Sequence, residues 1–382
     1  MISHVKMTLG LVRELVDRGH RVTYLSIPAF ADEVAPTGAD FVPYTSTLPV
    51  ANGLPPRAAN RLDMIEQFLT EQESLFPQLR SVFEKDRPDL LLCDRASDAV
   101  RILADDLGIP FLIFCTAVVP PQDQGERRTR QAAGVLDDPR GAELHQRLRA
   151  WLADNGQPDA DPWFWLDEPE RALALIPRCM QPASEAVNTN RYTFVGWCGD
   201  RPGPDDGWSR PDGVARVVFV SLGTVFTDRA GFYRDAIAAF ADRRGWHLVL
   251  QIGRHVDEAA LGPVQANVEV HRWVPQTSVL AACDVFVTHG GMGSSLEGIR
   301  SETPMIVVPQ SLDQFSNARR LVDLAVARQL DTDRVTPRRL RATAKKLVGD
   351  RKVAGRLAEV SAQIRADGGP AYAADLVEKC LP

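Results

Sequence analysis

Several features that would point to particular classes of protein are missing from this sequence. No apolar run reaches the roughly 18 residues that a membrane-spanning helix needs, so we expect no membrane span. The net charge is −6 and no block of basic residues occurs, which argues against nucleic acid as a partner. The six cysteines show no CxxC pairing. We therefore expect no metal site, and we interpret the cysteines as reduced core residues of a cytoplasmic protein.

The length and composition are those of a globular protein with two domains. The chain has 382 residues, of which 45% are hydrophobic and 25% charged, and a single core is usually smaller than this. Residues 199–213 are rich in Gly, Pro and Asp and have no periodicity, which is typical of a linker. We predict one domain at 1–200, a second at 201–365 and a terminal helix at 366–382.

Apolar strands alternate with amphipathic helices in both halves. Apolar residues at spacings of four, three and four predict a first helix that ends at Gly19. The predicted strands are 20–28, 89–94, 110–115, 216–223, 246–253, 268–273, 284–291 and 304–309. Buried strands that alternate with helices indicate parallel sheets. The predicted fold class is therefore α/β, with two doubly wound Rossmann-like domains facing a cleft.

The start of the first predicted domain departs from this scheme. A doubly wound domain normally opens with a strand and a glycine-containing turn before its first helix. Here only three residues precede His4, which already lies at the start of the first helix. We therefore expect the first strand of the N-terminal sheet to be missing.

The stretch VTHGGMGSSLEG, residues 287–298, follows a predicted strand and opens a helix. A helix N-terminus offers unpaired N–H groups and the positive end of a dipole, so it suits a phosphate group. His289 could donate to a phosphate oxygen, and Glu297 could accept from two ribose hydroxyls. The stretch lacks the GK[ST] of a Walker loop. From these residues alone, a glycine turn that serves only packing remains an alternative.

The surroundings of this loop resemble the donor-binding signature of nucleotide-sugar glycosyltransferases. Within 271–318 the matching positions are Trp273, Pro275, Gln276, Thr288, His289, Gly291, Ser294, Glu297, Pro304, Met305, Pro309, Asp313 and Gln314. The segments ELVDRGHRVTY, PDLLLCD, YTFVGWC, VSLGTVFT and GWHLVLQIGR are similar to the macrolide glycosyltransferase family of actinobacteria. The resemblance therefore covers nearly the whole chain.

Membership of this family implies the GT-B fold, in which the N-terminal domain binds the acceptor and the C-terminal domain binds a nucleotide sugar. It also implies an inverting sugar transfer that needs no metal and no cofactor beyond the donor. The terminal helix would return to the N-terminal domain. UDP-glucose is the expected donor, because Glu297 suits a ribose with both hydroxyls.

The resemblance assigns a donor contact to each matching residue. Trp273 would stack on the uracil ring beside Val274, Gln276 would face the base or ribose, and Glu297 would hold the ribose hydroxyls. The residues expected at the diphosphate are Ser221, Gly223, Thr224, His289, Gly291, Gly293 and Ser294. Asp313 and Gln314 would bind the sugar hydroxyls, which favours a hydroxyl-rich hexose.

The resemblance also supplies an acid–base pair. SHVKMT falls on the family pattern Gly-His-x-Asn-Pro, with Ser3 in place of the glycine and Lys6 and Met7 in place of Asn-Pro. His4 then aligns with the catalytic histidine, and Asp94 with the aspartate that orients it. A neutral imidazole there could take the proton of the attacking hydroxyl.

The acceptor is expected to be a macrolide or a similar hydroxylated, hydrophobic natural product. Candidate lining segments are 63–76 and 115–128, together with Trp163, Phe164 and Trp165. We expect a monomer or a homodimer. Two alternatives remain open from the sequence: a donor-binding auxiliary protein with an impaired catalytic half, and a UDP-sugar epimerase of the same architecture. A role in antibiotic resistance, detoxification or biosynthesis does not follow from these residues.

Overall fold

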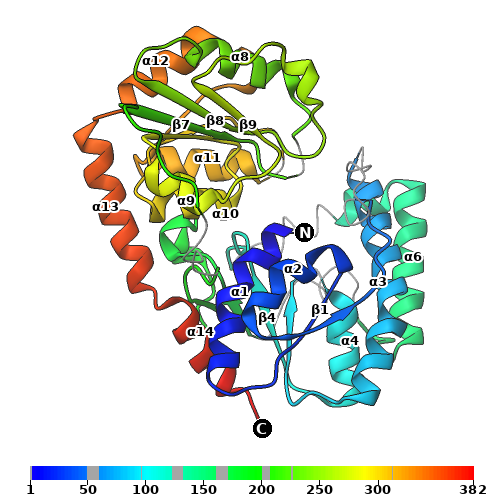
Figure 1. The fold of residues 1–382 in the computed structure, drawn as a ribbon. Coiled ribbons are helices and arrows are strands. Elements are labelled where there is room, and N and C mark those ends of the chain that lie inside the picture. Colours follow the sequence, from blue (N-terminus) through cyan, green and yellow to red (C-terminus); the bar gives the residue numbers. More distant parts are fainter. Residues whose placement is uncertain are drawn as a thin grey trace. The chain divides into compact units, whose positions relative to one another are not determined.

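The computed structural model describes residues 2–49, 60–95, 97–122, 132–160, 171–199, 207–224, 227–311 and 313–382. The chain forms two compact units (Figure 1). Unit 1 comprises Met1–Asp200 and Asp367–Pro382, and unit 2 comprises Arg201–Ala366. Among the helices in the described ranges, none combines the length and apolar character that a membrane crossing requires.

Unit 2 is built on one parallel sheet of six strands in the order β12-β11-β10-β7-β8-β9. Its strands are β7 (Arg216–Ser221), β8 (Trp246–Gln251), β9 (Val268–His271), β10 (Val285–Thr288), β11 (Met305–Val307) and β12 (Ala327–Gln329). The chain runs outward from β7 to β9, then returns to place β10 on the other side of β7. The strand order therefore reverses between β7 and β10, and such a switch point is where doubly wound sheets bind ligands.

Helices cover both faces of this sheet. Figure 1 shows α8 (Ala230–Phe240) and α12 (Pro337–Leu347) on one face, and α9 (Gln276–Ala282), α10 (Met292–Arg300) and α11 (Gln314–Asp323) on the other. Val218 and Val220 belong to the core under α8 and α12. Phe219, which points to the opposite face, stacks on Phe286 with ring centroids 5.1 Å apart. Burial on both faces explains why these strands are continuous apolar runs.

The strands of unit 1 form two separate parallel sheets. The smaller sheet pairs β1 (Thr23–Ser26) with β2 (Asp40–Pro43), and the larger has the order β3 (Leu91–Asp94), β4 (Phe111–Cys115), β5 (Ala172–Ala174), β6 (Tyr192–Phe194). Within the described part of the chain, no strand joins β1 to β3. The first strand of a doubly wound sheet lies in its middle, so the break falls where that strand would pair.

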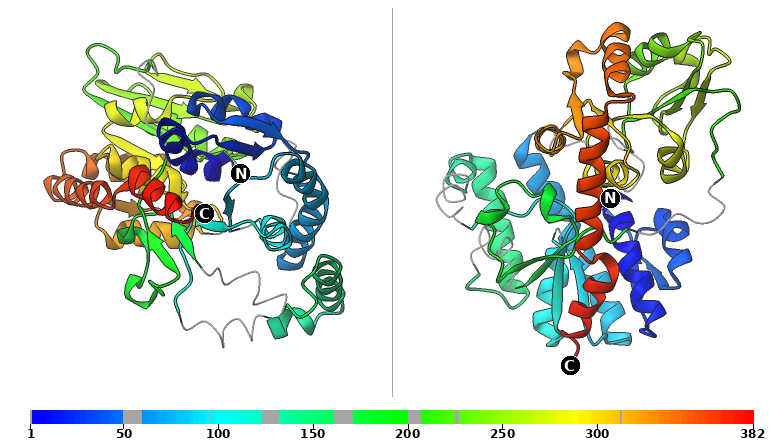
Figure 2. Two further views of the ribbon diagram at one scale, coloured as in Figure 1. Left: turned by 90° about the horizontal axis from the view of Figure 1, so that it is seen from below. Right: turned by 90° about the vertical axis from the view of Figure 1, so that its left-hand side faces the viewer.

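The helices of unit 1 surround these sheets. They include α1 (Ile2–Asp17), α2 (Ala31–Val34), α3 (Arg61–Lys85), α4 (Asp98–Leu107), α6 (Pro139–Asp154) and α14 (Gly369–Glu378), while α13 (Arg351–Ala366) ends unit 2. The long helix α3 lies beside α6 (Figure 2). Arg140 on α6 pairs with Asp63, and Arg147 pairs with Glu73. Their apolar faces share a core with α4.

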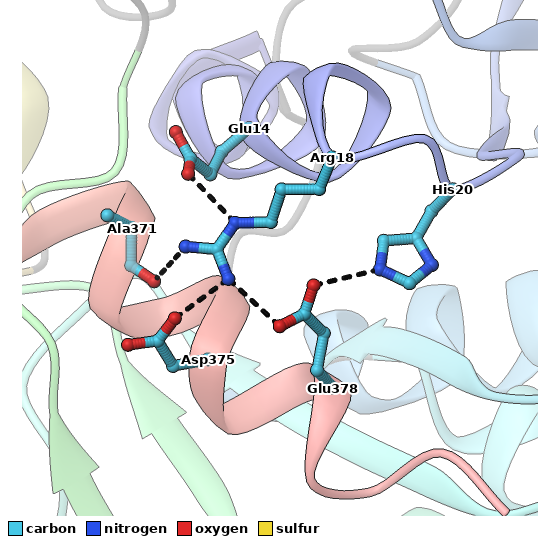
Figure 3. A network of polar contacts seen from close by, with 6 residues as sticks. All are labelled: Glu14, Arg18, His20, Ala371, Asp375 and Glu378. Atoms are coloured by element: carbon cyan, nitrogen blue, oxygen red, sulfur yellow. Dashed lines mark hydrogen bonds and ion pairs between the residues drawn. The ribbon is translucent and has the colours of Figure 1, made fainter.

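A polar network joins the C-terminal helix α14 to the end of α1 (Figure 3). The Arg18 guanidinium donates to Glu14 at 2.9 Å, to Asp375 at 2.7 Å, to Glu378 at 2.9 Å and to the carbonyl of Ala371 at 3.0 Å. The hydrogen bond from His20, followed by the contact with Arg18, holds the pKa of Glu378 below its usual range. Single surface ion pairs contribute little, but three acceptors on α14 around one planar guanidinium, which Glu14 holds from α1, fix the orientation of α14 on α1.

Gly10 lets a main-chain segment approach the middle of α1. The N–H groups of Gly10 and Leu11 both donate to the carbonyl of Cys198, at 2.8 and 3.3 Å. A Cβ atom on Gly10 would lie 2.5 Å from the carbonyl oxygen of Gly199. Because that neighbour is backbone, it has little freedom to move away from a side chain. The glycine therefore sets the position of α1, whose first turn carries His4.

We predict that Gly10→Ala destabilises the protein by about 1–2 kcal/mol. Alanine gains roughly 1 kcal/mol of helix propensity over glycine, but overpacking against backbone costs up to about 3 kcal/mol. Gly355→Ala on α13 is the matched control, since nothing lies within 4 Å of its added Cβ. Urea unfolding should show Gly355→Ala neutral or stabilising. Equal stabilisation by both changes would contradict the close approach at Gly10.

Candidate active site

The carboxyl ends of β7 and β10 bring two loops of unit 2 together around one imidazole ring. Ser221 at the end of β7 is the register partner of Thr288 at the end of β10, and His289 follows directly. A Cβ on Gly223 would lie 2.6 Å from His289 Cε1, and a Cβ on Gly291 would lie 2.4 Å from His289 Nε2. The ring thus fits between two backbones that have no side chains, so both glycines make room for His289.

Burial determines the charge of this imidazole. Desolvation lowers the pKa of His289 to about 4, opposed in part by its contact with the Ser221 backbone. The ring is therefore neutral at pH 7 and carries a single N–H. Its buried Nδ1 has no hydrogen-bond partner among the described residues. A neutral imidazole donates from one nitrogen only, so His289 can bind an anion, without bringing a buried charge, in the tautomer whose N–H faces that anion.

Helix α10 begins immediately after this ring. Gly290 has a φ of +82° and turns the chain, and Gly291 is the N-cap of α10. The first N–H groups of an α-helix have no acceptor within the helix, and the dipole makes this end partly positive. Nothing lies within 4 Å of a Cβ added to Gly293, so the first turn of α10 is open beside it. The diphosphate that the resemblance assigns to this loop would meet unpaired N–H groups at this end of α10.

The residues predicted for the base and ribose come from the β9–α9 loop, α9 and α10. Trp273 is 60% exposed, which leaves its indole face accessible for stacking. The Gln276 amide on α9 donates to Ser294 Oγ at 3.2 Å and to Glu297 Oε2 on α10. This contact holds the Glu297 carboxylate at the surface of α10, on the side that faces α9.

The residues predicted for the sugar lie at the start of α11. Gln314 is buried, and its carbonyl oxygen accepts from the N–H groups of Gln310 at 2.8 Å and Ser311 at 3.2 Å. Only its amide nitrogen remains to offer a ligand. Asp313 is exposed, and its Oδ2 accepts from Asn317, which also donates to the carbonyl of Gly290. Asn317 therefore links the start of α11 to the glycine loop, and no pattern in the sequence points to it.

The predicted acid–base pair meets in unit 1. His4 lies in the first turn of α1 and Asp94 is the last residue of β3, and His4 Nδ1 lies 2.7 Å from Asp94 Oδ2. An ionised carboxylate only accepts, so the proton of the neutral imidazole is on Nδ1. Nε2 then carries the lone pair. The exposed fractions of 31% for His4 and 21% for Asp94 leave the pair accessible to a substrate.

Tyr24 anchors α1 one turn beyond His4, and the sequence analysis did not identify it. Thr8 donates its hydroxyl proton to the carbonyl of Val5 at 2.8 Å, so Tyr24 must be the donor in its 3.0 Å contact with Thr8. Burial raises the pKa of Tyr24 to about 12, which keeps the phenol protonated. Residues 4 and 8 lie on the same face of the helix. Asp94 on β3 and Tyr24 on β1 therefore hold the same face of α1.

The predicted acceptor-lining segments are only partly described. Met64 and Phe68 on α3 are exposed at 40% and 41%, and their i, i+4 spacing places them on one face of that helix. Residues 123–128 of the second segment, and Trp163, Phe164 and Trp165, lie outside the described residues. In unit 2, Thr224 is exposed, whereas Ser221 is fully buried.

Curated proteins and a family model resemble this chain over much of its length. Oleandomycin glycosyltransferase of Streptomyces antibioticus is 45% identical over 100% of this chain and 89% of its own. Demethyllactenocin mycarosyltransferase of Streptomyces fradiae is 30% identical over 99% of this chain and 84% of its own. A family model described as erythromycin biosynthesis protein CIII-like, C-terminal domain, matches residues 247–380.

Solved structures show the same likeness. The glycosyltransferase of kitacinnamycin has a TM-score of 0.91 at 44% identity and covers 99% of this chain and 95% of its own. The calicheamicin glycosyltransferase has a TM-score of 0.81 at 31% identity, with 99% and 94% covered. The fold and these relatives therefore define a glycosyltransferase of the GT-B class. More narrowly, the chain belongs to the macrolide glycosyltransferase family of actinobacteria.

We predict that His289 makes folding stability depend on pH. Its pKa lies near 4 in the folded chain and near the ordinary 6.5 when unfolded. Between these values the unfolded chain binds more protons, so stability falls as the pH drops. The unfolding free energy of the native chain minus that of His289→Gln should fall by roughly 2 kcal/mol when the pH is lowered from 7 to 5. Urea unfolding of both chains measures this, and a difference independent of pH would contradict it.

Proposed function

We propose that this glycosyltransferase moves a hexose, with glucose from UDP-glucose as the leading candidate, to a hydroxyl of a macrolide or similar hydrophobic natural product. His4 is the general base, Asp94 orients it, and the anomeric centre is inverted. The assignment of His4 and Asp94 rests on the 2.7 Å contact between His4 Nδ1 and Asp94 Oδ2. It leaves Nε2 as the proton acceptor.

The chemical step follows from this assignment. The acceptor hydroxyl oxygen forms a bond to the anomeric carbon while its proton passes to His4 Nε2. The bond from the anomeric carbon to the diphosphate oxygen breaks, and its electron pair leaves with UDP. Asp94 stabilises the imidazolium that forms. The N-terminus of α10 and the neutral His289 stabilise the charge on the leaving diphosphate, so the proposed reaction uses no metal ion.

The donor assignment rests on the residues from α9 and α10. Trp273 offers its exposed indole to the base, and Gln276 holds Glu297 where a carboxylate can accept from ribose hydroxyls. Asp313 and the amide nitrogen of Gln314 are assigned to the sugar hydroxyls. A relative named as a mycarosyltransferase supports the transferase assignment but carries a different sugar in its name, so the donor needs its own test.

We expect His4→Ala to lower kcat on the order of 10²-fold or more, because the transition state loses its general base. Asp94→Asn should lower kcat as well, and neither change should alter the KM for the donor. The assay is UDP release from UDP-glucose with a panel of macrolides and flavonoids. His145→Ala, on α6, is the control and should keep its turnover. Full activity of His4→Ala would refute the assigned base.

The same assay separates the two alternatives. A transferase releases UDP only when an acceptor is present, and the acceptor gains the mass of a hexose. A UDP-sugar epimerase would release or convert the donor without any acceptor. An auxiliary protein would bind UDP and show no turnover with any member of the panel.

We expect wild type to bind UDP about tenfold or more tightly than 2′-deoxy-UDP, since a hydrogen bond to a charged group contributes about 1.5–3 kcal/mol. In Glu297→Ala this preference should disappear, because the carboxylate that accepts from the 2′-hydroxyl is gone. Calorimetric titration with both nucleotides and with dTDP measures it. Equal binding of UDP and 2′-deoxy-UDP by wild type would overturn the role of Glu297 and the preference for UDP.

A further inference from the structure

A buried glutamine connects the two loops that form the proposed donor site. Gln251 is the last residue of β8 and is 6% exposed. Its Nε2 donates to Ser221 Oγ at 3.1 Å, and its Oε1 accepts from the Val274 N–H at 3.1 Å. Ser221 is the last residue of β7, whereas Val274 lies beyond the end of β9. The Gln251 side chain therefore forms hydrogen bonds with the end of β7 and with the loop after β9, the two strands that flank β8.

At one end, Gln251 holds the phosphate loop, which we define as residues 221–224. Ser221 Oγ also accepts from the N–H of Gly223 at 3.3 Å, and Ser221 is fully buried. Ser221 thus acts by shaping the loop. Gly223 in turn lies against the ring of His289. The Gln251 amide therefore supports the backbone beside the proposed diphosphate contact.

At the other end, Gln251 holds the base loop, residues 272–275. His271 keeps the start of this loop in the sheet, since its carbonyl accepts from Ile252 at 2.9 Å. Val274, two residues past the start, is fixed by the Gln251 carbonyl oxygen. Trp273 lies between these two anchors and exposes its indole. The glutamine therefore restrains the residue next to the proposed stacking surface.

We propose that Gln251 is a positioning residue for the nucleotide donor. It sets the separation between the base loop and the phosphate loop, so that one nucleoside diphosphate spans both. The inference rests on the proposed function and adds a buried residue that acts through the two loops. The amide is needed because it offers one donor and one acceptor side by side without charge. Methionine matches its length and offers neither.

The test is the affinity of UDP, measured by calorimetry with Gln251→Met. We expect the Kd to rise about tenfold, the KM for UDP-glucose to rise with it, and kcat at saturating donor to change by less than about threefold. Gln265→Met is the matched control in the same unit. Gln265 lies before β9, at the opposite end of the sheet, and its buried Oε1 has no partner among the described residues. Its UDP affinity should be unchanged.

Ser221→Ala provides a second variant should Gln251→Met fail to fold. It removes the contact to the phosphate loop and leaves the contact to Val274. We expect it to weaken UDP binding, and Gln251→Met should cost less affinity in the Ser221→Ala background than in wild type. Wild-type UDP affinity in Gln251→Met, or equal losses in Gln265→Met, would overturn the inference and leave the proposed function standing. No binding of UDP or dTDP by the wild-type chain would refute both.

Discussion

The donor half of this molecule depends on one constraint, the parallel pairing of β7 with β10 at the point where the strand order reverses. Because the helices that follow these two strands lie on opposite faces of the sheet, the two loops diverge and leave the strand ends open between them. His289 occupies that position, with Gly223 on one side and Gly291 on the other. The two glycines leave room for the imidazole ring. The ring and the first turn of α10 then form the proposed anion site. The proposed phosphate site is thus a consequence of how the two loops pack around an imidazole.

In unit 1 the proposed acid–base pair also lies at the carboxyl end of a parallel strand. Asp94 is at the carboxyl end of β3, and it meets a histidine that α1 carries in its first turn. The position of that histidine depends on contacts along the whole helix: Tyr24 at Thr8, the Cys198 carbonyl at Gly10 and the α14 carboxylates at Arg18. A helix held at three levels keeps a base fixed close to its end, where helices otherwise fray. The C-terminal helix therefore contributes to the placement of His4 through α1.

The sequence predicted the α/β class and the position of most strands because buried parallel strands are apolar throughout and are bounded by turns. Short strands such as β5 and β12 were missed because three residues carry too little periodic signal. The predicted strand 284–291 was too long, since β10 ends at Thr288 and the glycines form the loop.

The residues of the donor site and the acid–base pair came from the resemblance, and their roles stay predictions. Gln251 and Asn317 were missed because they contact other loops, and nothing in the spacing of a chain shows which backbone groups a side chain will reach. The polar residue at the end of the apolar run WHLVLQ was the one available signal for Gln251.

The proposed function requires a nucleoside diphosphate bound across the ends of β7, β9 and β10, and a crystal structure of the protein with UDP would show whether it binds there. We expect the β-phosphate within hydrogen-bond distance of His289 and of the first N–H groups of α10, with the uracil stacked on Trp273 and the ribose hydroxyls at Glu297. UDP bound elsewhere, or bound with its diphosphate away from the N-terminus of α10, would contradict it.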